Sequence, residues 1–170
     1  ANMKMFSSSR AETVKLDDCG VAIHGRSFST QHVDTNLAAE FGPAEKGMFN
    51  IGLLHTSLDG REGHAAYAPC TPEDLRSKGY QYWALGHVHK QEFVSRDPYI
   101  VFPGCIQGRH IRETGAKGCV LGTVEDGWVK EIERCPLDVL RWVSCVVDLT
   151  DASEVTEVLE LARIAMINEQ

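Results

Sequence analysis

Three histidines follow two mostly apolar runs of the chain. His55 closes the run over residues 49–54, while His87 and His89 follow the run over residues 80–85 and are separated from it by a glycine. Runs of this composition, bounded by glycines, are typical of buried strands. A neutral imidazole offers one lone pair, and divalent transition metals accept it readily. The spacing therefore favours a metal site over three unrelated histidines held by hydrogen bonds.

The expected strands would position these imidazoles. Side chains alternate between the two faces of a strand, so His87 and His89 are expected to point the same way, while Val88 points back into the core. Gly86 has no Cβ, and backbone or a bulky ligand can approach it closely. Functional residues of parallel strands gather at the carboxyl ends. If the two strands are neighbours, we expect His55 to converge with the other two histidines.

Composition bounds the class of protein. A hydrophobic fraction of 43% and a charged fraction of 24% are those of an ordinary globular protein of one domain or slightly more. The formal net charge of -7 repels nucleic acid, so any polyanion must be held by a local basic patch or by bound metal. The six scattered cysteines, without a C-x-x-C pair, predict a reducing, cytoplasmic setting. No apolar run is long enough for a membrane span, and no membrane partner is expected.

The order of the elements indicates an α/β fold with a mixed β-sheet and flanking helices. Strands are expected over residues 20–23, 49–54, 80–85, 92–94, 99–102, 118–124, 128–132 and 140–149. Helices are expected over residues 30–41, 71–78 and 151–170, the second opened by the capping residue Thr71 and the third by Asp151. Asp126-Gly127 between two β-rich runs predicts a hairpin, and His24 is expected to be structural.

A glycine-bounded loop over residues 107–117 carries three cations, Arg109, Arg112 and Lys117. Phosphate recognition needs such cations close together, and arginine binds phosphate bidentately. An ordinary solvated basic loop explains the sequence equally well, so both interpretations stay open here.

The motifs together resemble the calcineurin-like metallophosphoesterases. The resemblance rests on His55, on Gly86-His87-Val88-His89 and on Phe102-Pro103-Gly104. The stretches 83–89 and 103–109 look more closely like the bacterial SbcD-type DNA repair exonucleases. The resemblance covers residues 19–137 and implies a sandwich of two sheets between helices. Residues 1–18 are then expected to be a tail or linker, and residues 138–170 the truncated start of a capping or accessory domain.

What the resemblance implies for the chemistry is a two-metal hydrolysis of DNA phosphodiester bonds. It implies that His55 and His87 ligate one divalent ion and His89 the other, with manganese as the usual metal and zinc or ferrous iron as alternatives. It also implies phosphate or DNA contacts at Arg109 and Arg112. The implied partners are DNA, an SMC-like ATPase of the SbcC type and a second copy of the chain.

The family's remaining metal ligands lie in an amino-terminal half that carries an Asp-x-His, a Gly-Asp-x-x-Asp and a Gly-Asn-His-Asp motif. None of these occurs in this sequence. We therefore expect only the carboxyl half of the catalytic domain here, enzymatic in the complete protein and inactive alone. A two-metal site needs a bridging carboxylate that histidines do not supply.

Two other interpretations remain open. The same superfamily includes phosphatases and small-molecule phosphodiesterases, and the acidic net charge slightly favours such a substrate over DNA. A non-catalytic interaction module that holds a single zinc on three histidines is a different class altogether.

Overall fold

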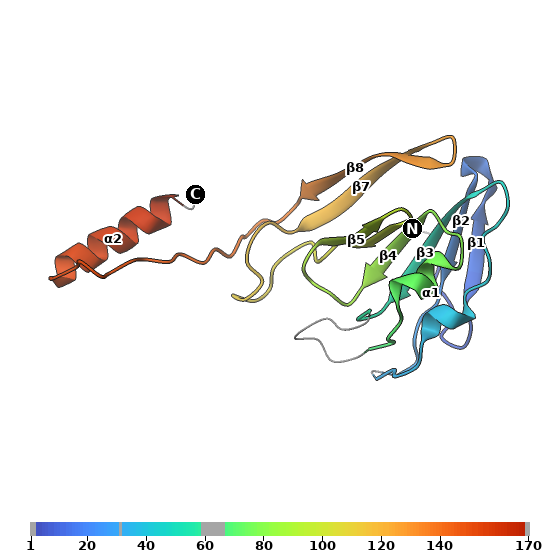
Figure 1. The fold of residues 1–170 in the computed structure, drawn as a ribbon, viewed down its shortest axis with the longest axis horizontal. Helices are drawn as coiled ribbons and strands as arrows, with labels where there is room; N and C mark the ends of the chain where they lie inside the picture. Colours follow the sequence, from blue (N-terminus) through green and yellow to red (C-terminus); the bar gives the residue numbers. More distant parts are fainter. Residues whose placement is uncertain (1–2, 31, 59–66, 169–170) are drawn as a thin grey trace.

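A mixed six-stranded sheet forms the body of the protein in a computed structural model that describes residues 3–30, 32–58 and 67–168 (Figure 1). The strand order is β1-β2-β3-β4-β6-β5. The strands are β1 Glu12–Leu16, β2 Val21–Gly25, β3 Phe49–His55, β4 Tyr82–Gly86, β5 Glu92–Arg96 and β6 Tyr99–Phe102. The four inner strands run parallel, and β1 and β5 pair antiparallel at the two edges. The predicted α/β class with a mixed sheet is confirmed.

Helix α1, Pro72–Arg76, lies on the connection between the parallel strands β3 and β4. Its first turn is fixed by the predicted cap, because the Thr71 hydroxyl accepts the Asp74 N–H while the Asp74 carboxylate accepts the Thr71 N–H. The helix packs on the sheet through Trp83, whose indole N–H donates to the Leu75 carbonyl at 3.2 Å. A Cβ on Gly52 would lie 2.3 Å from the Trp83 ring, so only glycine leaves room for the indole on β3.

His24 is structural, as the sequence predicted. It is buried on β2, where its Nε2–H donates to Asn50 Oδ1 at 2.9 Å and its Nδ1 accepts the Thr13 hydroxyl at 2.8 Å. The ring stacks on Tyr80 with 4.1 Å between centroids. Asn50 in turn bonds the backbone of Glu45 and Met48. This network joins β1, β2 and β3 and fixes where β3 begins.

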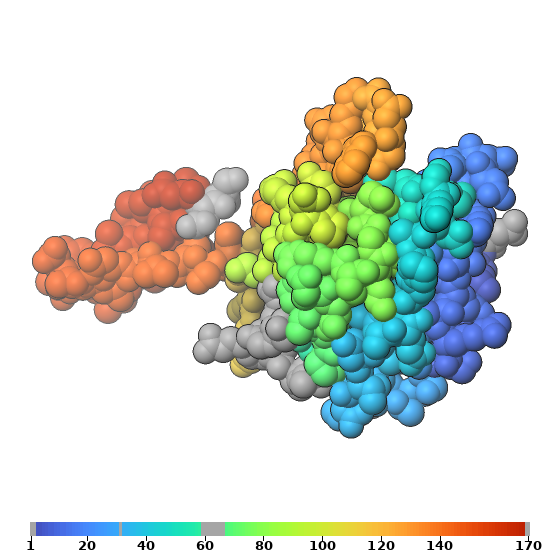
Figure 2. Space-filling view, turned by 45° about the vertical axis from the view of Figure 1, so that its right-hand side comes forward, coloured from blue at the N-terminus to red at the C-terminus, as the bar shows by residue number. Residues whose placement is uncertain are grey.

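A separate hairpin follows the sheet. Strands β7, Gly118–Glu125, and β8, Trp128–Pro136, pair antiparallel around a turn in which Asp126 and Gly127 both have positive φ, as two-residue hairpin turns require. The predicted hairpin is confirmed. In Figure 2 it projects from the sheet-containing body, while helix α2, Val155–Asn168, stands apart on another side.

Two predictions about the remaining elements are wrong, one of them in part. Residues 140–149 form no strand. At their start, the side-chain amide of Gln107 accepts the Val139 and Leu140 N–H groups and donates to the Leu140 carbonyl, and Trp142 forms only an isolated bridge with Thr114. The predicted helix over 30–41 reduces to a single 3₁₀ turn, η2 Leu37–Glu40, with residues 32–36 non-helical. Within residues 1–18, Glu12–Leu16 form β1, which pairs antiparallel with β2.

Helix α2, Val155–Asn168, begins close to the predicted point and has no buried residue. Several of its apolar side chains are exposed, Val155 and Leu159 among them. None of the described helices is long and apolar enough to cross a membrane. The predicted domain boundary at residue 138 stays a prediction.

Candidate metal centre

His55 and His87 meet at the carboxyl ends of the adjacent parallel strands β3 and β4. In the register of these strands His55 lies opposite Gly86, as expected for neighbours. The His55 imidazole lies close over Gly86, since a Cβ built there would come within 2.8 Å of Nδ1. His87 Nδ1 lies 3.3 Å from His55 Nε2, and the two rings are nearly perpendicular. The strands β3 and β4 are neighbours, as predicted, and they bring His55 and His87 together.

The two nitrogens form a hydrogen bond between the imidazoles in this structure, and their spacing also fits one metal ion. Two nitrogens bound about 2.1 Å from a tetrahedral ion lie about 3.4 Å apart, close to the 3.3 Å found here. Burial lowers the pKa of His55 below its ordinary value, and the charge of His89 acts in the same direction. Neutral His55 therefore offers a lone pair at neutral pH, as a metal ligand must.

The Tyr67 ring packs against both His55 and His87. Its ring stacks parallel to His87 at 5.5 Å between centroids and meets His55 edge-on at 5.1 Å. The backbone of Tyr67 is held beside the residues that follow β3, because the Ser57 N–H donates to the Tyr67 carbonyl and the Ser57 hydroxyl accepts the Tyr67 N–H. Burial raises the pKa of the Tyr67 phenol, so it stays neutral. An aromatic wall excludes water from one side of the two imidazoles.

His89 does not follow the alternation expected from a continued strand. β4 ends at Gly86, and His87 has a φ of 104°, a left-handed conformation that turns the chain out of the strand. The expectation that His87 and His89 share one strand face is therefore wrong. His89 faces Glu113 instead, and its Nδ1–H donates to the Glu113 carboxylate at 2.5 Å. This bond leaves Nε2 as the nitrogen able to bind a metal.

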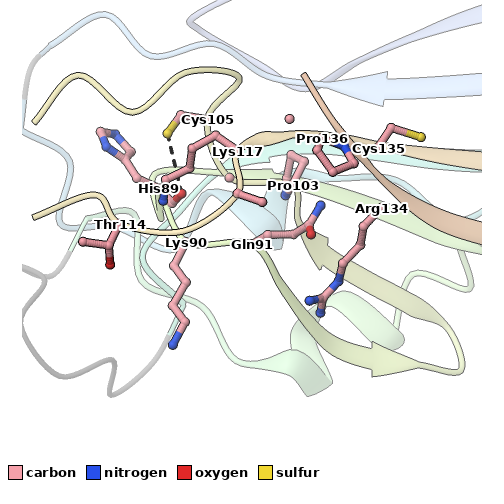
Figure 3. Close-up of a pocket in the computed structure, with 13 residues that line it drawn as sticks. His89, Lys90, Gln91, Pro103, Cys105, Thr114, Lys117, Arg134, Cys135 and Pro136 are labelled. Atoms are coloured by element: carbon pink, nitrogen blue, oxygen red, sulfur yellow. Dashed lines mark hydrogen bonds between the residues drawn. The ribbon is translucent and has the colours of Figure 1, made fainter. Parts of the chain in front are cut away.

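Glu113 is the candidate site residue that the sequence did not point to. Its second carboxylate oxygen accepts the Arg109 N–H at 2.7 Å, so the loop holds it in place. The hydrogen bond from His89, followed by that from Arg109, lowers the pKa of Glu113 and keeps it ionised. Glu113, His89 and Cys105 place their donor atoms within 4.8 Å of one another, and the Cys105 thiol lies against the His89 carbonyl (Figure 3).

The donor set suits divalent transition metals. Imidazole nitrogens of His55 and His87 stand at ligand spacing, and a third imidazole is braced by a carboxylate, as metal-binding histidines commonly are. Within the described residues, however, no carboxylate bridges the His55–His87 pair and His89. The residues therefore fit part of a two-metal site.

Arg109 and Arg112 both lie exposed on the turn that carries Glu113. Their backbone N–H groups bond Glu113 and His110, respectively. In the part of the chain that the structure describes, neither guanidinium forms an ion pair. Their role in phosphate binding stays a prediction.

Comparison with known proteins gives one informative match. No family model matches the chain. Over 165 residues, 94% of the chain, it is 38% identical to an uncharacterized metallophosphoesterase, YhaO, of Bacillus subtilis strain 168. The chain spans 40% of the length of that relative. This similarity supports the metallophosphoesterase superfamily.

Proposed function

We propose that the chain is part of a divalent-metal-dependent phosphoesterase of the metallophosphoesterase superfamily, and that the complete protein is a DNA repair exonuclease. The observation that carries the proposal is the pair of imidazole nitrogens, 3.3 Å apart, at the ends of two adjacent parallel strands. The similarity to a metallophosphoesterase supports the reaction class. The DNA substrate, the second metal ion and the choice of manganese rest on the sequence motifs.

Each residue of the site would have a distinct role. Divalent metal held at these nitrogens would polarise a phosphoryl oxygen and lower the pKa of a bound water. His55 and His87 would hold one ion, with Gly86 giving the space for the His55 ring. Glu113 would orient His89 and fix its tautomer. Arg109 and Arg112, exposed beside Glu113, would approach the phosphate of the substrate.

We also propose that this segment alone is inactive. A two-metal hydrolysis needs a carboxylate that bridges the ions, and the described residues offer only Glu113 beside one of the three histidines. The experiment therefore uses the complete polypeptide that contains these residues. We expect manganese-dependent cleavage of duplex DNA that His87→Ala abolishes, while His32→Ala, at an exposed histidine, has no effect. Cleavage retained by His87→Ala would overturn the proposal.

A second candidate keeps the superfamily and changes the substrate to a small phosphodiester or phosphoprotein. The formal net charge of -7 favours it, since the chain as a whole repels DNA. Competition between duplex DNA and a small chromogenic diester separates the two. If DNA fails to inhibit hydrolysis of the diester, the small substrate is favoured. One tightly bound zinc and no hydrolysis of either substrate would instead indicate the non-catalytic module.

For the complete protein we further propose an SMC-like ATPase partner of the SbcC type and a homodimer. Both rest on the motif resemblance alone. Co-purification of the tagged protein from its own cells, followed by mass determination of the complex, tests the two together. A complex without an ATPase of that type, or a mass corresponding to one copy, argues against the respective proposal.

A further inference from the structure

A cavity of about 380 Å³ lies beside His89, within the range of sizes typical of ligand sites (Figure 3). Its walls come from three separate places: the turn after β4, the loop after β6, and the base of the β7-β8 hairpin with the residues before it. His89, a candidate metal ligand, is one of the lining residues. The cavity therefore adjoins the candidate metal centre without being part of the His55–His87 pair.

The lining of this cavity is basic although the chain is acidic. Lys90, Lys117 and Arg134 contribute cations, and none of the lining residues is an aspartate or glutamate. Among the described residues, none of these three cations forms an ion pair. In a chain with a formal net charge of -7, three cations brought together from distant segments make a local site for an anion.

Two carboxylates near the cavity, those of Glu113 and Asp138, are bonded to other groups than the side-chain cations of the cavity. Glu113 accepts hydrogen bonds from His89 and from the Arg109 backbone. Asp138 forms a two-pronged ion pair with Arg141, and its side chain is only 2% exposed. Neither of these carboxylates therefore pairs with the side chain of Lys90, Lys117 or Arg134.

Two of the three cations are positioned by the fold. Both the N–H and the carbonyl of Lys117 are bonded to Asp138, which fixes its backbone at the start of the hairpin. The Arg134 guanidinium lies over the Phe93 ring, 5.2 Å from its centroid, which restrains the side chain. In Figure 3 the Lys90 and Arg134 side chains extend in the same direction. Anion sites gain affinity when their cations are held in place before binding.

We propose that this cavity binds a phosphate group of a nucleic-acid strand other than the phosphate that is hydrolysed. The inference rests on the proposed function and deepens it. A small phosphodiester carries one negative charge, and the metal centre would hold it. A second cationic site beside His89 serves only a substrate with a further phosphate at a fixed distance along its backbone. The cavity thus favours an oligonucleotide over a small diester.

The test measures binding without metal, so that the metal centre does not contribute. A fluorescently labelled single-stranded oligonucleotide is titrated with the complete polypeptide in EDTA. We expect Lys117→Glu to weaken binding at least about tenfold, and to lower the slope of log affinity against log salt by about 0.7 for each phosphate that the variant no longer binds. Arg134→Gln, a milder change that leaves the Lys117 backbone bonds in place, should weaken binding in the same direction.

The matched control is Lys46→Glu, which changes the net charge by the same amount. Lys46 is exposed and precedes β3, at the end of that strand opposite to His55. Binding unaffected by Lys46→Glu but weakened in both cavity variants supports the inference. Equal decreases in affinity at Lys46 and Lys117, or a wild-type protein that does not bind in EDTA, overturn it.

A separate assay tests the proposed function: hydrolysis of a small chromogenic diester by the wild-type protein in the presence of manganese. If the protein hydrolyses the diester but does not bind the oligonucleotide in EDTA, the proposed phosphate site is wrong and the proposed phosphoesterase activity stands. If the protein binds the oligonucleotide through the cavity cations but hydrolyses no diester, the phosphate site is supported and the proposed phosphoesterase activity is wrong. The two failures are therefore distinguishable.

Discussion

His55 Nε2 and His87 Nδ1 lie 3.3 Å apart although 32 residues separate them in the chain. The parallel pairing of β3 and β4 accounts for this closeness, because it puts His55 opposite Gly86 and the next residue beside it. Two imidazoles at this distance repel one another when both are protonated, but share one divalent ion readily when both are neutral. Metal binding is thus the property of the site that is tested most directly.

We expect His55→Ala and His87→Ala each to lower metal affinity by at least about a hundredfold, since each removes a direct ligand and loss of outer partners alone costs about 10- to 100-fold. Titration of Mn²⁺ or Zn²⁺ by calorimetry measures the change. His32→Ala, at an exposed histidine, is the control and should bind like the wild type. If both variants bind the metal as tightly as the wild type, His55 and His87 are not metal ligands.

Gly86→Ala should weaken metal binding with little loss of stability. The added Cβ would lie 2.8 Å from His55 Nδ1, so the imidazole must rotate away from His87. The His55 imidazole can move at a small cost in stability, but its position as a metal ligand would be lost. We therefore expect metal affinity to fall about tenfold or more. Gly122→Ala on β7 is a matched control, because the nearest atom to its new Cβ is 3.9 Å away. Parallel losses of stability and affinity would argue for general misfolding instead.

The sequence was sufficient where local signals agree with the fold. Apolar runs bounded by glycines predicted β3 and β4, and the Asp126-Gly127 pair between two β-rich runs predicted the β7-β8 hairpin. The Thr71 cap indicated the start of α1. In each case a few residues that are adjacent in the sequence determine the element, so it can be predicted without knowledge of distant contacts.

The sequence failed where a distant partner decides the structure. Residues 140–149 have a strand-like composition, but no described strand pairs with them, and the Gln107 side chain holds their start instead. His89 meets Glu113, 24 residues away, and no spacing rule relates a loop glutamate to a histidine after a strand. The positive φ of His87 likewise broke the alternation on which the same-face prediction relied.

Glu113→Gln should lower metal affinity by about 10- to 100-fold, the usual cost of losing the carboxylate that braces a histidine ligand. The change removes the negative charge opposite His89 Nδ1–H but keeps the size of the side chain. Competition with a chelating dye measures the affinity. Glu133→Gln, at an exposed position on β8, is the control. Glu113→Asp should recover part of the affinity, and a Glu113→Gln variant as tight as wild type would show that Glu113 has no positioning role.

Stability should fall as the solution becomes acidic, because of His24. Burial lowers the pKa of His24 below its ordinary value of 6.5, against the smaller opposing effect of its hydrogen bond to Asn50. Below about pH 6.5 the unfolded chain therefore takes up a proton that the folded chain does not. This part of the stability is present above that pH and is lost as the pH falls through the folded pKa. His55, whose pKa burial also lowers, acts in the same direction.

Urea denaturation in EDTA at about pH 8 and about pH 5.5 measures the effect. His24→Gln should cost about 1–3 kcal/mol at the higher pH, because Thr13 or Asn50 is left without its partner. The same variant should show a smaller difference between the two pH values, with the remainder due to His55. A wild-type protein whose stability is flat or rises toward pH 5.5 would contradict the assignment of His24 as a buried neutral imidazole that joins β1, β2 and β3.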